Sequence, residues 1–203
     1  MLDHRLVDVQ RNMLRPLAFW LSRRGVSADS LTWIGFGAGI GGAASVALQH
    51  YGLGLTLILL NRVLDGLDGA VARETGPTDR GAFLDIALDF FFYAAVPFGF
   101  AVADPNANAL AASALLVAFV GTGSSFLAFA TIAAKRNLTS MAFPRKGIYY
   151  LGGLTEGAET IAAFVAMCLW PAHFAILAWS FAALAALTTG FRWWWGWRCF
   201  GAA

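Results

Sequence analysis

The chain has 203 residues, of which 59% are hydrophobic and 13% are charged. A soluble domain carries about 25% charged residues, so this composition argues against a soluble globular protein. The apolar residues form long blocks, which favours membrane-spanning helices over the alternating pattern of a β-barrel. The net charge of +2 says little by itself, and no nucleic-acid partner is expected.

Residues 1–24 are predicted to form an amphipathic helix at the membrane surface. Apolar residues recur at steps of three and four, with arginines between them: Leu2, Leu6, Val9, Met13, Leu17 and Trp20. This stripe suits a helix in the plane of the interface, with a solvated basic tail as the alternative. We expect Gly25 to end this helix and Ser27 or Ser30 to cap the next one.

Six apolar segments follow, each near the length of about 20 residues that spans a bilayer as a helix. They cover roughly 31–50, 53–73, 81–103, 108–134, 148–170 and 172–192. We therefore predict an all-α integral membrane protein, with residues 1–30 as an interfacial helix and turn and residues 31–203 as one domain of six transmembrane helices. In the first span, the pairs Gly35/Gly39 and Gly37/Gly41 favour close helix packing.

Lysine and arginine are unevenly distributed between the loops. With six spans, one side receives all of them except Arg62, which lies inside the second span, and the loops around residues 51, 105 and 171 have none. The positive-inside rule then puts both termini in the cytoplasm, for a multi-pass protein of the inner membrane.

The second and third predicted spans carry four aspartates, Asp65, Asp68, Asp85 and Asp89. Spacings of three and four residues put each pair on one helix face, and the short connection makes the two helices antiparallel neighbours, so the carboxylates converge. One carboxylate within hydrocarbon costs at least about 2.5–3.5 kcal/mol on insertion scales, so we expect bound cations. Oxygen ligands favour Mg²⁺, Mn²⁺ or Ca²⁺ over Zn²⁺.

Two such cations suit displacement at phosphorus, because they stabilise the attacking and leaving oxygens. Gly69 and Gly81 leave room for a nucleotide or pyrophosphate, and Arg73 offers a fork for phosphate. Asp89 lies one turn deeper than Asp85, in a place suited to taking a proton from an incoming hydroxyl.

These residues form the pattern D-x-x-D-G-x-x-A-R, seven residues, then G-x-x-x-D-x-x-x-D, with no position missing. The pattern resembles the signature of the CDP-alcohol phosphatidyltransferase family, and the chain looks similar to its bacterial phosphatidylglycerophosphate-synthase-like members. The resemblance implies transfer of a phosphatidyl group from a CDP-linked donor, usually CDP-diacylglycerol, to an alcohol, with release of CMP, in phospholipid biosynthesis. It also implies a homodimer.

The resemblance assigns roles by motif position. Asp65, Asp68 and Asp85 would hold two divalent cations, Mg²⁺ or Mn²⁺, and Asp89 would be both a metal ligand and the general base. The donor nucleotide would be contacted by Gly69, Arg73, Thr78, Gly81, Asp29 and Ser30. Relatives often have Pro-Asn where this chain has Ala28-Asp29, which weakens the last part of that assignment.

The acceptor is less well defined. Residues predicted to bind it are Lys135, Arg145, Lys146, Glu156, Glu159 and Arg192. The positive-inside rule alone also explains the positions of the basic residues. Ion pairs with Arg62, Lys146 or Arg192 would also explain the two glutamates. Arg62 either balances the charge of the aspartates or extends to the interface. Glycerol 3-phosphate is the first expected acceptor, with inositol phosphate, another polyol or a lipid as alternatives.

Two other functions fit a membrane protein with buried acids. A divalent-cation transporter would need carboxylates at mid-membrane and an outward exit, and it leaves Gly69, Arg73 and Gly81 without a purpose. A non-catalytic scaffold would tolerate the loss of an aspartate, and none is lost. We therefore favour the transferase.

Overall fold

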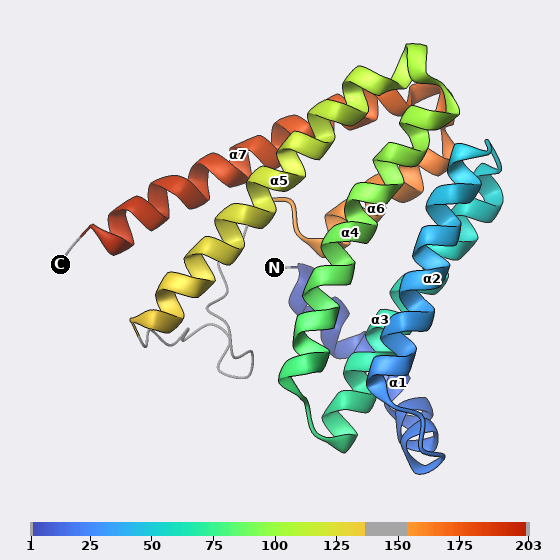
Figure 1. The fold of residues 1–203 in the computed structure, drawn as a ribbon, viewed down its shortest axis with the longest axis vertical. Coiled ribbons are helices and arrows are strands. Elements are labelled where there is room, and N and C mark those ends of the chain that lie inside the picture. Colours follow the sequence, from blue (N-terminus) through green and yellow to red (C-terminus); the bar gives the residue numbers. More distant parts are fainter. Residues whose placement is uncertain (1, 137–153, 202–203) are drawn as a thin grey trace. The chain divides into compact units, whose positions relative to one another are not determined.

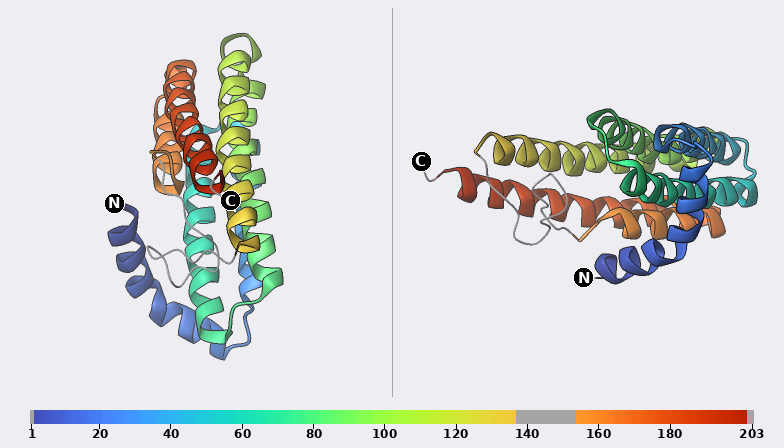
Figure 2. Two further views of the ribbon diagram at one scale, coloured as in Figure 1. Left: turned by 90° about the vertical axis from the view of Figure 1, so that its left-hand side faces the viewer. Right: turned by 90° about the horizontal axis from the view of Figure 1, so that it is seen from below.

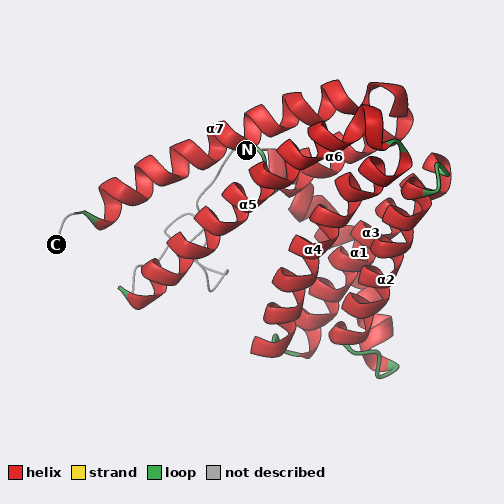
Figure 3. Cartoon of the chain, turned by 45° about the horizontal axis from the view of Figure 1, so that its top comes forward, coloured by secondary structure: helices red, strands yellow, loops and turns green. Residues whose placement is uncertain are grey.

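The computed structural model describes residues 2–136 and 154–201, and these residues are helical apart from short connections (Figure 1). The α-helices are α1 (Leu2–Arg23), α2 (Ala28–Ala47), α3 (Tyr51–Thr75), α4 (Asp79–Ala103), α5 (Pro105–Lys135), α6 (Gly157–Leu169) and α7 (Phe174–Phe200), and a 3₁₀ turn, η1 (Pro171–His173), precedes α7. Figure 3 shows helices joined by short loops and turns, and no strand occurs in the described residues. The predicted all-α class is confirmed.

The chain divides into two compact units, Met1–Asn106 and Ala107–Ala203. The first contains α1 to α4 and all four aspartates of the predicted metal site. The second contains nearly all of α5, together with α6, η1 and α7.

In the first unit, α2 packs along both α3 and α4. Small residues permit this close approach. A Cβ added at Gly39 of α2 would lie 2.6 Å from the Phe92 ring of α4, and one added at Gly42 would lie 3.1 Å from the Gly54 carbonyl oxygen of α3. Of the two predicted packing pairs, Gly35 and Gly39 are buried, whereas Gly37 faces open space.

Helix α1 packs on α3 and crosses it obliquely (Figure 2). One face, with Leu14, Ala18 and Leu21, joins an apolar cluster around Leu67 and Val71. The adjacent face leaves three members of the predicted stripe exposed: Met13, Leu17 and Trp20. An exposed apolar stripe on a helix tied to the bundle agrees with a position at the membrane surface.

The sequence signals at the ends of α1 and α2 are confirmed. Gly25, at φ +77°, follows the last turn of α1 in a conformation that side chains other than hydrogen rarely adopt. The Ser27 hydroxyl then accepts a hydrogen bond from the Ser30 backbone N–H at 3.1 Å and caps α2. Helix α2 therefore begins at Ala28, three residues before the predicted span.

Helices α3 and α4 run antiparallel, joined by residues 76–78 (Figure 1). The Thr78 hydroxyl accepts a hydrogen bond from the Gly81 N–H at 3.0 Å and caps α4. Both helices pack extensively on α2. The aspartates therefore face one another, as their helical spacing predicts. Helix α2 lies beside them, which the sequence does not predict.

In the second unit, α6 packs with α7. Within the predicted fifth span, 148–170, the described residues 154–156 are not helical, and α6 begins at Gly157. Glu156 and Glu159 form a capping box there: each side chain accepts from the other residue's backbone N–H. The earlier part of that span lies outside the described residues.

Among the residues that the structure describes, four helical segments are long and apolar enough to cross a membrane: Ala28–Ala47, Asp79–Ala103, Pro105–Lys135 and Pro171–Phe200. Helix α3 has 25 residues but carries Arg62, Asp65 and Asp68 in its interior, and the described part of α6 has 13 residues. The chain is therefore a multi-pass membrane protein, and the number of six spans stays a prediction.

Candidate active site

The four aspartates line one cleft in the first unit. Asp65 and Asp68 approach it from α3, and Asp85 and Asp89 approach it from α4. Thr32 and other residues of α2 complete the lining. The convergence predicted from the helical spacing is therefore present, with α2 as one wall of the cleft.

Three of the four aspartates form a tight group. One carboxylate oxygen each from Asp65, Asp68 and Asp85 lies within 4.8 Å of the other two. Asp68 is buried, Asp65 is half-buried and Asp85 is exposed, so the group reaches from the helix packing to an opening. Three converging oxygen donors with formal negative charge fit a hard divalent cation such as Mg²⁺ or Mn²⁺.

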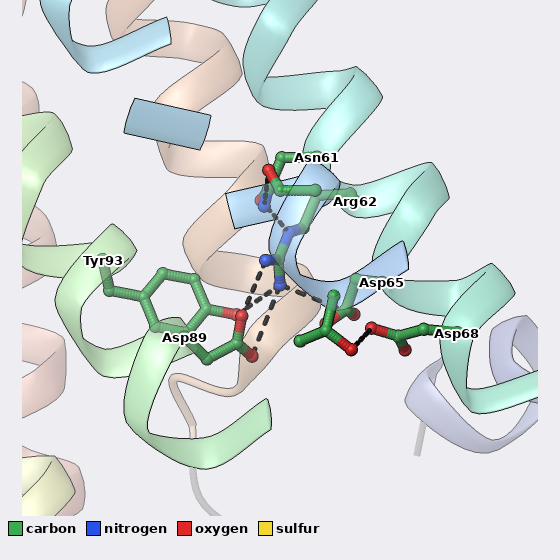
Figure 4. A network of polar contacts seen from close by, with 8 residues as sticks. Asn61, Arg62, Asp65, Asp68, Asp89 and Tyr93 are labelled. Carbon is green, nitrogen blue, oxygen red and sulfur yellow. Dashed lines mark hydrogen bonds and ion pairs between the residues drawn. The ribbon is translucent and has the colours of Figure 1, made fainter. Parts of the chain in front are cut away.

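Asp89 has a different partner. Its Oδ1 accepts a hydrogen bond from Arg62 Nη2 at 2.7 Å, and its Oδ2 lies 3.5 Å from Arg62 Nη1. It does not belong to the group of three, and Figure 4 shows it beside Arg62 and Tyr93. Its role as a metal ligand and base therefore stays a prediction.

Arg62 lies at the centre of the polar network in Figure 4. Its Nη1 lies 3.6 Å from Asp65 Oδ2 and 3.3 Å from the Tyr93 hydroxyl, and its Nε donates to Asn61 Oδ1 at 2.7 Å. The side chain is only 16% exposed. Of the two interpretations open from sequence, charge balance within the cluster agrees with this geometry and extension to the interface does not.

Three polar residues around the aspartates were not found from the sequence. The Thr32 hydroxyl lies 2.6 Å from Asp68 Oδ2, Asn61 orients Arg62, and Tyr93 contacts Arg62. Two carried a signal. Asn61 is a polar residue inside an apolar helix, and Tyr93 follows Asp89 by four residues, on the same face. Thr32 carried none, because its contact depends on how α2 packs against α3.

Residues predicted at the donor nucleotide gather where α2 and α4 begin. A Cβ added at Gly81 would lie 3.2 Å from Thr78 Oγ1 and 3.3 Å from Asp29 Oδ1, so these three residues are adjacent. Asp29 also pairs with Arg80 at 2.6 Å. Ser30 is in the first turn of α2, where its hydroxyl lies 2.8 Å from that of Ser27.

Gly69 and Arg73 lie one turn apart on α3. A Cβ added at Gly69 would be 3.4 Å from Arg73 Nη1, which places the guanidinium beside this bare stretch of helix. The aspartates, Gly69 and Arg73 share α3, and Gly81 shares α4 with the remaining aspartates. Contact of any of these residues with a nucleotide stays a prediction.

The residues predicted for the acceptor belong to the second unit or lie outside the described residues. Lys135 ends α5, and Arg192 is buried on α7, where its Nη1 donates to the Thr122 carbonyl oxygen at 3.0 Å. Glu156 and Glu159 cap α6. Arg145 and Lys146 lie outside the described residues. Their role as acceptor ligands stays a prediction.

The first unit is thus a helical membrane unit with a cleft whose acids suit a divalent cation. Residues 25–194 match the CDP-alcohol phosphatidyltransferase family, and the chain belongs to this family. It is therefore a transferase of substituted phosphate groups that moves a phosphatidyl group from a CDP-linked donor in lipid synthesis. Membership confirms the predicted enzyme class over the transporter and the scaffold.

The chain is also similar to two relatives and to one solved structure. The chain is 52% identical over 196 residues to the inner membrane protein YnjF of Escherichia coli (strain K12), covering 97% of this chain and 95% of the relative. A phosphatidylinositol phosphate synthase of Streptomyces avermitilis is 40% identical over 92 residues, 44% of this chain and 38% of the relative.

The solved fold is that of Mycobacterium tuberculosis phosphatidylinositol phosphate synthase, which is 24% identical to this chain in two crystal structures. In complex with manganese and citrate it has a TM-score of 0.70, covering 91% of this chain and 88% of that one. With CDP-DAG bound it has a TM-score of 0.66, covering 92% and 94%. The likeness shows a common fold.

Proposed function

We propose that this protein transfers the phosphatidyl group of CDP-diacylglycerol to a hydroxyl group of a polyol phosphate. The acceptor oxygen forms a bond to the phosphorus of the phosphatidyl group, the bond from that phosphorus to the bridging oxygen breaks, and CMP leaves. The observation that carries this proposal is the separation of Asp89 from the tight group of Asp65, Asp68 and Asp85. The solved relative with CDP-DAG bound supports the choice of donor.

Asp65, Asp68 and Asp85 are the residues proposed to hold the divalent cations, two ions of Mg²⁺ or Mn²⁺. The manganese complex of the solved relative supports a cation of this class. When bound, such cations neutralise charge on the donor pyrophosphate and stabilise the leaving oxygen. Thr32, by its contact with the Asp68 carboxylate, keeps one of these ligands in a fixed orientation.

Asp89 is the proposed general base. Its carboxylate is 30% exposed, lines the cleft and lies outside the group of three, so an acceptor hydroxyl can approach it. The carboxylate would take the hydroxyl proton as the oxygen attacks phosphorus. Whether Asp89 also contacts a metal is a separate part of the same prediction.

Gly69, Arg73, Thr78, Gly81, Asp29 and Ser30 are the proposed contacts of the CDP moiety. Arg73 offers parallel N–H groups to phosphate, and Gly81 lies next to Thr78 and Asp29. Gly69 and Arg73 lie in the last turns of α3, Thr78 and Gly81 at the start of α4, and Asp29 and Ser30 in the first turn of α2. The nucleotide would therefore lie at this end of the unit, which we propose faces the cytoplasm of a cell with an inner membrane.

The acceptor is proposed to be a polyol phosphate, and two candidates compete. The sequence favours glycerol 3-phosphate. The synthases of Streptomyces avermitilis and Mycobacterium tuberculosis are named for phosphatidylinositol phosphate, and these names favour inositol phosphate as the acceptor. Either acceptor is anionic and would be held by Lys135, Arg145, Lys146 and Arg192, with Glu156 and Glu159 available for hydroxyl groups. A homodimer remains part of the proposal.

Purified protein in detergent with Mn²⁺ and labelled CDP-diacylglycerol tests this function. The assay offers each acceptor separately and reads CMP release together with the lipid product by mass spectrometry. We expect release that depends on the acceptor, and one phosphorylated polyol to give the fastest rate. No release of CMP with any polyol would overturn the proposal.

The variant Asp89→Asn adds a test of the base. The amide keeps the size of the side chain but does not accept a proton, so we expect transfer to be lost while labelled CDP-diacylglycerol still binds. Turnover near the wild-type rate in this variant would remove Asp89 as the base. Loss of donor binding would instead give it a role in holding the donor.

A further inference from the structure

Arg62 is fixed by contacts on all three of its nitrogens. Nε donates to Asn61 Oδ1 at 2.7 Å, and Asn61 in turn donates from Nδ2 to the Gly35 carbonyl oxygen of α2 at 2.9 Å. Nη2 binds Asp89 at 2.7 Å, and Nη1 lies near Asp89, Asp65 and the Tyr93 hydroxyl. The guanidinium is therefore tied to α2 on one side and to α4 on the other.

Aromatic rings hold the guanidinium as well. The Cζ of Arg62 lies 4.8 Å from the centroid of the Phe92 ring and 5.5 Å from that of the Tyr93 ring. Phe92 is fully buried. A cation held over two rings, with an amide on its third side, has little freedom to leave its carboxylate partner. Only the geometry of a planar fork satisfies all these contacts at once, so lysine is not an equivalent residue.

Four carboxylates line the cleft, and within the part of the chain that the structure describes Arg62 is the cation in its lining. The guanidinium contacts Asp89 closely and Asp65 at longer range. Arg62 therefore contacts the four aspartates unequally. It binds Asp89, which is outside the group of three, and it places a positive charge beside that group.

We propose that Arg62 is a positioning residue for the transfer: it holds Asp89 apart from the other three aspartates and, through its charge, weakens their hold on a divalent cation. The part concerning Asp89 rests on the proposed function, whereas the part concerning the cation does not. Arg62 thereby separates the base, Asp89, from the three aspartates that hold the metal. Because it weakens cation binding, the bound cation can also coordinate the substrate phosphate.

The sign of the effect on cation binding follows from Coulomb's law. A positive charge next to a carboxylate group repels a divalent cation bound there, and the repulsion is strong at a site shielded from water. Removal of the charge by Arg62→Met should therefore tighten binding of Mn²⁺ by about tenfold or more. A substitution that merely damaged the fold would weaken binding, so the two explanations predict opposite results.

Three variants and the wild type separate charge from geometry. Binding of Mn²⁺ alone is measured from the spin-resonance signal of the free ion, without substrate. Arg62→Met should bind Mn²⁺ more tightly, and Arg62→Lys, which keeps the charge, should bind it within a few-fold of the wild type. Arg15→Met is the matched control, because it also removes a guanidinium of this unit, but one that is 76% exposed and pairs with Glu74 at 3.7 Å. It should not change Mn²⁺ binding.

Activity gives the second readout. Arg62→Met and Arg62→Lys should both lower kcat with little change in KM for the CDP-lipid donor, because each leaves Asp89 without the fork that orients it. Tyr93→Phe, which removes one contact of Arg62 and leaves its charge, should lower kcat less than either. Equal kcat in Arg62→Lys and the wild type would overturn the positioning of Asp89.

The two parts fail separately. Unchanged or weaker Mn²⁺ binding in Arg62→Met would overturn the role of the charge, whatever the activity. If the wild type releases no CMP with any acceptor, the proposed function fails, while the Mn²⁺ titrations still decide the role of Arg62.

Discussion

At the scale of single residues, the main finding is that four aspartates with one side-chain chemistry occupy two environments. Asp65, Asp68 and Asp85 share a small volume, and Asp89 is bound to a guanidinium. Helical spacing alone predicts correctly that all four aspartates lie on facing helix surfaces. The spacing does not separate Asp89 from the other three, because that difference comes from Arg62. The orientation of the Arg62 side chain depends on the packing of three helices.

Thr32 supplies a prediction at this scale. Its hydroxyl lies 2.6 Å from the buried Asp68 carboxylate. Thr32→Val keeps the shape of the side chain but removes that contact, so Asp68 loses its orientation. Loss of such a supporting contact typically costs about 10–100-fold in metal affinity. We expect a weaker Mn²⁺ titration in this range.

The matched control for Thr32→Val is Thr56→Val on α3. The Thr56 hydroxyl is exposed to the surroundings and bonds only to the Gly52 carbonyl oxygen of its own helix at 2.9 Å. This variant should titrate like the wild type. If both variants lose affinity equally, the contact between Thr32 and Asp68 has no special part in holding the metal.

At the scale of elements, helix α2 determines how far apart the acid-bearing helices lie. Its small residues let α3 and α4 approach, and a Cβ added at Gly39 would lie 2.6 Å from the Phe92 ring and 3.1 Å from Asn61 Cγ. Both of these residues also contact Arg62. The packing of α2 and the orientation of the guanidinium are therefore coupled.

Gly39→Ala tests this coupling. The added methyl group has no room without movement of Phe92 or Asn61, and overpacking of this kind typically costs about 1–3 kcal/mol. We expect a lower free energy of unfolding in detergent and a loss of transfer activity. Gly37→Ala is the control on the same helix, because nothing lies within 4 Å of its added Cβ. Equal loss in both variants would contradict the packing argument.

Elements were predicted well where local chemistry ends a helix and less well where it does not. Gly25 and Ser27 ended and capped helices as expected, and the predicted span ends on either side of the α3–α4 connection differ from the helix ends by two residues, because turn and capping residues act over a few positions. Residues 154–156 fall within the predicted fifth span but are not helical, because the apolar residues before Glu156 suggested a longer helix from composition. The capping box that begins the helix was visible in the sequence as two glutamates three residues apart, which we instead assigned to the acceptor.

At the scale of the whole molecule, the topology is the main prediction. The uneven distribution of lysine and arginine places residues 76–78 in the cytoplasm and the α2–α3 connection outside it. In a variant without Cys168 and Cys199, Gly52→Cys should react with a membrane-impermeant maleimide in cells with a permeable outer envelope. Pro77→Cys should react only after the membrane is broken. The reverse pattern would place the acids on the opposite side of the membrane.

The sequence was informative about the membrane class because composition and long apolar blocks constrain it directly. It was less informative about the number of spans, because Arg62, Asp65 and Asp68 make α3 resemble a polar helix by hydropathy. The same residues that identify the chemistry thus weaken the signal for a membrane span. Pair contacts such as that of Thr32 with Asp68 depend on the three-dimensional approach of two helices, which no short pattern records.

The division of the chain at Asn106 has a consequence for the way such enzymes diversify. All four aspartates, including the proposed base Asp89, and every residue proposed to contact CDP precede that point, whereas the other residues proposed to bind the acceptor follow it. On these proposed roles, the bond-breaking chemistry and the choice of alcohol would be encoded in separate segments of the gene. Substitutions in the second segment would then exchange one alcohol for another without changing the acids.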